Sequence, residues 1–454
     1  QGNVLVLIGR YDEALPLLEH AVKMHPGHTR SWARLGNALR QVGRLEDALK
    51  AYEQAVMLDP LFAWAWNEMG IALEALGHHD DALRAYRHAG DAAPDEALYL
   101  YQQAEVLVSL GRYPEALALL AQSLQIDNRS PHTWAKHGQV LRRMERIEES
   151  LGSFNRAVEL DPDYAWAWNG RGLTLSALGR HEDAIFCFQK AAEVDASDVW
   201  YWYNLGDELV GMGRAVEGLT ALEQATRLNP RHPESWAKMG QAFRRLERYA
   251  ESLDAYDKSL ALHPRYAWAW NGRGQALAAL GRREEALASY ERAVQEDATI
   301  VWYYSNQVDL LLDMGRRHEA LAAMEGAVRS LPRNATAWAQ RGKVLRRLAE
   351  HEAAAESYRK AVEIDPAYAW AWNGLGLALA ALDRWLEARD SFALAVEHHS
   401  SDVWFWHNYG EALIHCGDYR RAVDAFEHAL EIVSDHEPSE QKLRAARRKL
   451  MEES

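Results

Sequence analysis

Residues 165–198 read AWAWNGRGLTLSALGRHEDAIFCFQKAAEVDASD, and the same pattern returns every 34 residues along the chain. A glycine stands at the eighth position of this unit in ten copies, and successive glycines are 34 residues or twice 34 residues apart, without any insertion. These glycines are Gly36, Gly70, Gly138, Gly172, Gly206, Gly240, Gly274, Gly342, Gly376 and Gly410. A fixed period of this length is typical of repeat architectures. We therefore expect one elongated array rather than the roughly three domains that the chain length alone would suggest.

Other positions of the unit recur with the same period. A tryptophan stands four residues before each of these glycines: Trp32, Trp66, Trp134, Trp168, Trp202, Trp236, Trp270, Trp338, Trp372 and Trp406. An alanine at position 20 and an aromatic residue at position 24 are also common, as at Ala184 and Phe188. A second glycine such as Gly179 and a closing proline such as Pro162 are residues that end helices. Each unit is therefore predicted to form a helix, a short turn and a second helix, with the tryptophan and the position-24 aromatic filling the space between them.

This pattern resembles the tetratricopeptide repeat over essentially the whole chain. The resemblance implies an all-α fold, an α-α superhelix (TPR solenoid) of about thirteen units. We expect a partial, N-terminally truncated repeat at residues 1–28, twelve complete repeats at 29–436, and a capping helix at 437–454 that turns Leu443, Ala446 and Leu450 toward the array. Gly2 falls on position 8 of the partial repeat, so we also expect the array to begin upstream of Gln1.

A longer period of 102 residues is superimposed on the first, because three successive repeats differ from one another and the trio recurs. Arginine units carry paired arginines at positions 12 and 13, with Arg40-Gln41 as the divergent first copy, and occupy residues 29–62, 131–164, 233–266 and 335–368. Tryptophan units begin Ala-Trp-Ala-Trp-Asn and occupy residues 63–96, 165–198, 267–300 and 369–402. Ladder units occupy residues 97–130, 199–232, 301–334 and 403–436, and all but the first carry tryptophan at position 2 and asparagine at position 6.

In the family that the chain resembles, positions 2, 5, 6, 9, 12 and 13 of the first helix face the concave side of the superhelix. The resemblance therefore implies a candidate partner-binding groove lined by three sets of residues. The tryptophans are Trp64, Trp166, Trp268 and Trp370 of the tryptophan units and Trp200, Trp302 and Trp404 of the ladder units. The asparagines are Asn67, Asn169, Asn271 and Asn373 at position 5 and Asn204, Asn306 and Asn408 at position 6. The arginines are Arg142, Arg143, Arg244, Arg245, Arg346 and Arg347.

Asparagine suits such a groove because its amide both donates and accepts hydrogen bonds, as does the backbone of an extended peptide. The position-6 set resembles the asparagine ladder in the superhelical repeats of O-linked N-acetylglucosamine transferase. Tryptophan would take apolar side chains, and arginine would select acidic groups. Three alternatives stay open: the tryptophans pack against the preceding repeat, the asparagines cap or bridge neighbouring helices, or the arginines pair with position-9 carboxylates of an adjacent repeat.

Composition and motifs narrow the class of function. The net charge of −15 speaks against a nucleic-acid partner, because neutralising phosphates needs a dominant basic surface. The 2 cysteines are too few for a disulfide framework, and neither a signal peptide nor a long apolar run is present. We therefore expect a cytoplasmic, bacterial protein without membrane insertion. No phosphate loop, zinc motif or nucleophile elbow is found, so we expect neither an enzyme nor a cofactor or metal.

The leading interpretation is a non-catalytic protein-binding scaffold or sensor module that holds a peptide or partner protein in the groove. One alternative is self-assembly into a homo-oligomer or filament, which near-identical units in regular phase would suit. Another is the recognition arm of a larger bacterial signalling or defence protein whose effector domain lies upstream.

Overall fold

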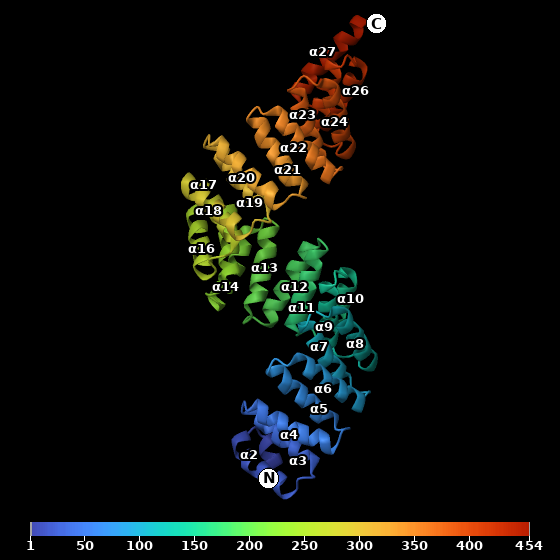
Figure 1. Ribbon diagram of the computed structural model, residues 1–454, viewed down its shortest axis with the longest axis vertical. Coiled ribbons are helices and arrows are strands. Elements are labelled where there is room, and N and C mark those ends of the chain that lie inside the picture. The colour runs from blue at the N-terminus through green and yellow to red at the C-terminus, as the bar shows by residue number, and fades with distance from the viewer. Residues whose placement is uncertain (1, 454) are drawn as a thin grey trace. The chain divides into compact units, whose positions relative to one another are not determined.

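The structure is a computed structural model that describes residues 2–453, and over that range the chain forms 27 helices and no strand (Figure 1). Within each of two compact units, consecutive helices pack against each other, so the expected all-α repeat fold is confirmed. The helices form two compact units, Gln1–Pro230 and Arg231–Ser454, and each unit is a stack of helix pairs. Within residues 2–453, no helix combines the length and the apolar character needed to span a membrane.

The first compact unit holds helices α1 to α14. Their bounds are α1 Gly2–Leu7, α2 Tyr11–Met24, α3 Thr29–Gln41, α4 Leu45–Leu58, α5 Ala63–Ala75, α6 His79–Ala92, α7 Ala97–Ser109, α8 Tyr113–Ile126, α9 Pro131–Arg143, α10 Ile147–Leu160, α11 Ala165–Ala177, α12 His181–Val194, α13 Val199–Gly211 and α14 Ala215–Leu228.

The second compact unit holds helices α15 to α27. Their bounds are α15 Pro233–Arg245, α16 Tyr249–Leu262, α17 Ala267–Ala279, α18 Arg283–Glu296, α19 Val301–Asp313, α20 Arg317–Ser330, α21 Ala335–Arg347, α22 His351–Ile364, α23 Ala369–Ala380, α24 Trp385–His398, α25 Val403–His415, α26 Tyr419–Ile432 and α27 Glu437–Glu453.

The turn inside each repeat uses a left-handed backbone conformation at position 15. Gly179 adopts it with a φ of 72°, which glycine reaches without steric cost. Four repeats place a residue with a side chain there: Glu145 (φ 61°), Glu247 (φ 59°), Ala349 (φ 62°) and Asp383 (φ 56°). The turn geometry is therefore kept where the sequence lacks the glycine that marks it elsewhere.

The position-8 glycine lets the two helices of a repeat approach closely. A Cβ atom on Gly172 would lie 2.6 Å from a carbon of the Phe188 ring, and Phe188 is 1% exposed.

The position-4 tryptophan packs between the helices and also makes a hydrogen bond. Trp168 is half-buried, and its Nε1 donates to the Pro162 carbonyl oxygen at 2.8 Å. The same bond is made by Trp66 to Pro60 and by Trp270 to Pro264. Each such tryptophan fastens its helix to the turn before it.

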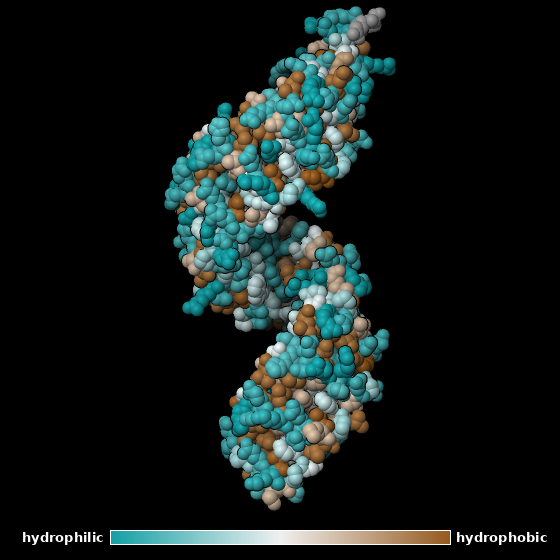
Figure 2. Space-filling view, viewed as in Figure 1, coloured by the Kyte–Doolittle hydropathy of each residue, from teal (hydrophilic) through white to brown (hydrophobic). Residues whose placement is uncertain are grey.

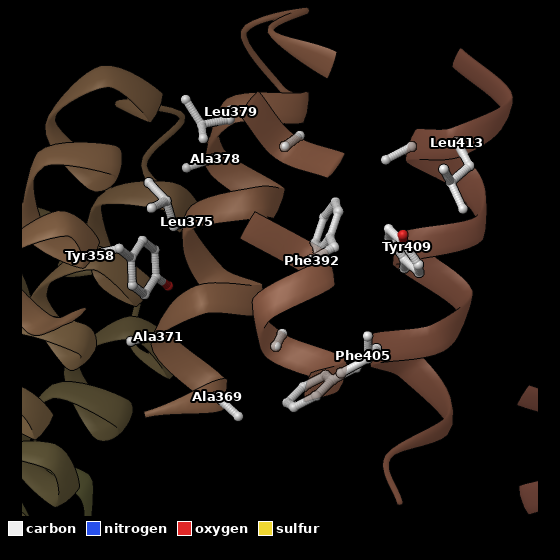
Figure 3. Close-up of a cluster of buried hydrophobic side chains, with 14 of the residues drawn as sticks. Tyr358, Ala369, Ala371, Leu375, Ala378, Leu379, Phe392, Phe405, Tyr409 and Leu413 are labelled. Carbon is white, nitrogen blue, oxygen red and sulfur yellow. The ribbon is translucent and has the colours of Figure 1, made fainter. Parts of the chain in front are cut away.

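The core of the second compact unit follows the same plan (Figure 3). The ring of Phe392 lies between the helix that carries Leu375 and the helix that carries Tyr409, and all three are buried. Beyond this core, α27 packs against α26 with Leu443 and Ala446 buried. Four basic residues of α27 are exposed, namely Arg444, Arg447, Arg448 and Lys449.

Candidate functional site

The candidate residues lie on the first helices of the repeats, at positions 2, 5, 6, 9, 12 and 13, which we call the first-helix surface. Where an arginine unit meets the following tryptophan unit, these residues border a pocket. In the second compact unit one such pocket, of about 360 Å³, is lined by residues that include Arg244, Trp268, Asn271 and Trp302. An equivalent pocket of about 350 Å³ is lined by residues that include Arg346, Trp370 and Asn373. Tryptophan, asparagine and arginine from successive repeats are therefore brought together twice.

The two asparagine sets form pairs across neighbouring repeats. Asn204 Nδ2 donates to Asn169 Oδ1 at 2.8 Å. The same bond joins Asn306 to Asn271 at 2.8 Å and Asn408 to Asn373 at 2.9 Å. The position-5 members of these pairs are buried and the position-6 members are half-buried. Bridging of neighbouring helices, one of the interpretations left open by the sequence, therefore describes all three pairs.

Each pair still has hydrogen-bonding capacity that the described residues do not use. Asn169 Nδ2 remains a donor and Asn204 Oδ1 remains an acceptor, and neither makes a hydrogen bond within residues 2–453. The first copy has no such pair, because Gln102 replaces the position-6 asparagine. Asn67 is 5% exposed there, and its Oδ1 finds no partner among the described residues.

The position-2 tryptophans fall into two groups. Three of them lie under a basic side chain from the preceding arginine unit. The distance from the charged group to the ring centroid is 5.2 Å for Arg34 over Trp64, 5.4 Å for Lys136 over Trp166 and 4.7 Å for Lys238 over Trp268. The other four are more open, with Trp200 49%, Trp302 59%, Trp370 59% and Trp404 51% exposed. In the last arginine unit Gln340 takes the place of that basic residue, in agreement with the exposure of Trp370. On the face shown in Figure 2, hydrophobic residues are scattered among hydrophilic ones.

Three of the position-9 carboxylates in the ladder units pair with lysines. Lys136 Nζ lies 2.9 Å from Glu105 Oε1, and Lys343 Nζ lies 3.3 Å from Asp309 Oδ1. Lys442 of α27 pairs with Glu411. Because Lys136 also covers Trp166, it links three successive repeats along the first-helix surface. The pairing that the sequence suggested for the arginines is therefore made by other residues in these three places.

The position-12 arginines are half-buried, and their surroundings differ between the first copy and the later ones. Arg40 Nη2 lies 2.9 Å from Glu68 Oε2. Arg142, Arg244 and Arg346 make no ion pair within residues 2–453. The Nε of all four arginines, Arg40 included, is buried without a partner, so the ion pair with Glu68 is what distinguishes the first copy. Burial, together with the charge of Arg143, lowers the pKa of Arg142. The position-13 arginines Arg143, Arg245 and Arg347 are exposed.

Sequence reasoning missed the residues that set this difference. Position 6 of the tryptophan unit is Glu68 in the first copy and glycine in the others, namely Gly170, Gly272 and Gly374. A comparison of the four tryptophan units at that position would have found the change. A further pocket of about 700 Å³, lined by residues that include Glu325, Arg341 and Lys360, contains none of the candidate residues.

Comparison with protein families gives one consistent match along the chain. Models described as tetratricopeptide repeat match residues 7–51, 67–131, 129–197, 203–267, 237–299 and 405–436, and a model described as TPR repeat matches 36–77 and 342–383. No curated protein matches the chain.

Among solved structures, the chain is similar to yeast Tom70, with 16% identity over 94% of this chain and 96% of that one at a TM-score of 0.47. It is similar to the APC/C hetero-tetramer Cut9-Hcn1, with 14% identity over 98% and 95% at a TM-score of 0.40. It is also similar to YrrB, described as a TPR protein with an unusual peptide-binding site, with 21% identity over 40% of this chain and 95% of that one at a TM-score of 0.36.

Proposed function

Because the chain belongs to the tetratricopeptide repeat family, we propose that it is a non-catalytic scaffold or sensor module that holds an extended polypeptide on its first-helix surface. The proposal rests on the asparagine pairs. Each pair retains at least one amide donor and one amide acceptor, and a peptide group of an extended backbone needs both. Asn271 and Asn373 border pockets large enough to admit part of a peptide.

The bond within each pair fixes which amide atoms stay available. Asn306 Nδ2 is committed to Asn271 Oδ1, so Asn306 presents its oxygen and Asn271 presents its nitrogen. A preoriented pair loses little side-chain entropy when a ligand binds. The exposed tryptophans beside the pairs, Trp302 among them, supply apolar contact area to the ligand's side chains. Backbone recognition of this kind tolerates many peptide sequences.

The test begins with random peptides displayed on phage and selected on the immobilised full chain. A selected peptide is then titrated into the wild-type protein and into the triple variant Asn204→Ala/Asn306→Ala/Asn408→Ala. Each lost hydrogen bond is worth about 1 kcal/mol, or roughly fivefold in affinity, so the triple variant should bind about a hundredfold more weakly. Gln189→Ala serves as the matched control, because Gln189 is an exposed amide on the second helix α12.

A peptide in which one backbone amide is replaced by an ester sharpens the test. The ester should weaken binding to the wild-type protein and have less effect on the triple variant, because the two changes remove the same hydrogen bonds. Failure to select any peptide, or equal affinity of wild type and triple variant, would reject the proposal. If a second copy of the chain is the occupant, light scattering will instead rise with concentration in the wild type and not in the triple variant.

A further inference from the structure

The first copy of the arginine unit contains a closed ion pair. Glu68 is 8% exposed, and its Oε2 accepts from Arg40 Nη2 at 2.9 Å and from Asn37 Nδ2 at 3.1 Å. Arg40 comes from position 12 and Asn37 from position 9 of the arginine unit, whereas Glu68 comes from the next repeat. Two donors of one repeat thus hold a carboxylate supplied by its neighbour.

The later copies keep the donors but lack the carboxylate. Position 12 is Arg142, Arg244 or Arg346, and position 9 is Gln139, Gln241 or Lys343, all of which can donate. Among these donors, Lys343 also pairs with Asp309. The carboxylate position is glycine in all three copies. Arg142 has no ion pair or side-chain hydrogen bond within residues 2–453, whereas Arg40 pairs with Glu68; the Nε of both arginines is buried without a partner, so the missing ion pair is the difference. A half-buried guanidinium without a counter-charge is costly, which points to an anionic partner that the chain itself does not provide.

Packing explains part of this change and leaves space beside the arginine. A Cβ atom on Gly272 would lie 2.3 Å from the Tyr256 ring, and one on Gly374 would lie 2.3 Å from the Tyr358 ring. These rings bring no negative charge, since burial raises the pKa of Tyr256 to about 12 even though Arg244, which interacts with the Tyr256 hydroxyl, opposes the shift. The pocket of about 360 Å³ still opens onto Gly272, Arg244 and Gln241. The pocket of about 350 Å³ likewise opens onto Gly374, Arg346 and Lys343.

We propose that the junctions at Arg142, Arg244 and Arg346 each bind an acidic side chain of an extended peptide, in the place that the Glu68 carboxylate takes in the first copy. This inference rests on the proposed function and names the chemistry that the same surface selects. Arg244 lies with the exposed Trp302 around one pocket, so the preferred peptide carries an acidic residue close to an apolar one. The first-copy junction is already closed by Glu68 and binds no acidic side chain.

The test uses the phage library of random peptides and two variants of equal charge. The variant Arg142→Gln/Arg244→Gln/Arg346→Gln removes the three open junctions. Its control, Arg87→Gln/Arg156→Gln/Arg227→Gln, removes three exposed arginines of second helices. Peptides selected on the wild type and on the control should be enriched in aspartate and glutamate next to apolar residues, and peptides selected on the junction variant should not. Circular dichroism melts check that all three proteins are equally folded.

A selected peptide is then compared with versions in which its glutamate is changed to glutamine or phosphoserine. The glutamine peptide should bind the wild type about tenfold more weakly than the glutamate peptide does, because the lost contact is a charge-assisted hydrogen bond. The junction variant should bind the two peptides with equal affinity. A preference for phosphoserine over glutamate would overturn the choice of a carboxylate. Selected peptides without acidic enrichment would overturn this inference and leave the proposed function intact, whereas failure to select any peptide would reject both.

Opening the first junction gives an independent check. Glu68→Gly removes the internal carboxylate and leaves Arg40 as Arg142 is in the wild type. In a titration with excess acidic peptide, the Glu68→Gly protein should show one more binding site than the wild type. It should also bind the peptide more tightly. An unchanged number of sites and unchanged affinity would contradict the equivalence of the four junctions.

Discussion

Trp168 donates a hydrogen bond from Nε1 to the backbone carbonyl of Pro162 across 2.8 Å, joining a repeat to the turn that precedes it. Trp168→Ala should lower the free energy of unfolding by about 3–5 kcal/mol, because it removes both the bond and a large part of the inter-helix packing. Trp168→Phe keeps a ring and should cost about 1–2 kcal/mol. Denaturant titrations measure both values. Trp302→Ala is the control, since Trp302 is 59% exposed and should change stability little.

The left-handed turn residues offer a stabilising change. Glu145 has a φ of 61° at a position where glycine stands in other repeats. Glu145→Gly should raise the free energy of unfolding by about 1 kcal/mol, because the left-handed conformation costs a residue with a Cβ about 1–2 kcal/mol and glycine nothing. Glu145→Ala keeps the Cβ and should show no comparable gain. Thermal melts of the two variants distinguish strain from any effect of the glutamate charge.

The repeat fold was predictable because its determinants are local and periodic. Gly172, Trp168 and Phe188 recur at fixed spacing, and each meets its partner within one repeat or at the next turn. The turns at Glu145 and Ala349 show where this reasoning stops, since neither residue type favours a left-handed conformation.

The candidate site was predictable in residue type and less so in contacts. Spacing placed Asn169 and Asn204 on first helices of adjacent repeats, but only their relative orientation decides that one donates to the other. The role of Glu68 depends on a contact with Arg40 from another repeat. Contacts between repeats are set by tertiary packing, so residue periodicity alone does not give them.

The pH dependence of stability should include a contribution from His407. His407 is 7% exposed in α25, and its Nδ1 lies 3.0 Å from Ser439 Oγ in α27. Burial lowers the pKa of His407 below the usual 6.5, Glu411 opposes this shift, and His436 and Lys442 add to it. The unfolded chain therefore takes up a proton first as the pH falls. The free energy of unfolding should be level above 6.5 and decrease below 6.5 until the folded histidine titrates.

Denaturant midpoints measured between about pH 7 and about pH 5 check this expectation. His407→Gln should show a smaller loss of stability over that interval than the wild type, whatever its stability at neutral pH. His137 also has a pKa lowered by burial, so some pH dependence will remain. His20→Gln is the control, since His20 is exposed on α2. An identical pH dependence in the wild type and His407→Gln would show that His407 is not held neutral by the fold.

The two cysteines should differ in reactivity. Cys187 is 1% exposed, and burial raises its pKa to about 11, so almost none of it is thiolate at neutral pH. Cys416 is half-buried, with a pKa that burial also raises. A colorimetric disulfide reagent should titrate one thiol in the native protein and both after denaturation. Cys416→Ser should abolish the native reaction and Cys187→Ser should leave it; the reverse pattern would contradict the burial of Cys187.

The bond between Asn306 and Asn271 can be measured as a coupling energy. Asn306→Ala should destabilise the protein by about 1–3 kcal/mol, because it leaves the Oδ1 of Asn271, which is 5% exposed, without its donor. In the double variant with Asn271→Ala that acceptor is gone. The double variant should therefore lose about 1 kcal/mol less stability than the sum of the losses in the two single variants.

The unpaired first copy supplies the comparison for this cycle. Asn67 is as buried as Asn271 but has no partner for its Oδ1, and Gln102 stands where a position-6 asparagine would be. A cycle of Asn67→Ala with Gln102→Ala should therefore show no coupling. Coupling confined to the paired repeats, together with weaker peptide binding by Asn306→Ala, would show that the position-5 asparagine positions an amide that the ligand then uses. Strictly additive costs at Asn306 and Asn271 would mean that the two amides act independently, and the pair would lose its role in orienting the ligand.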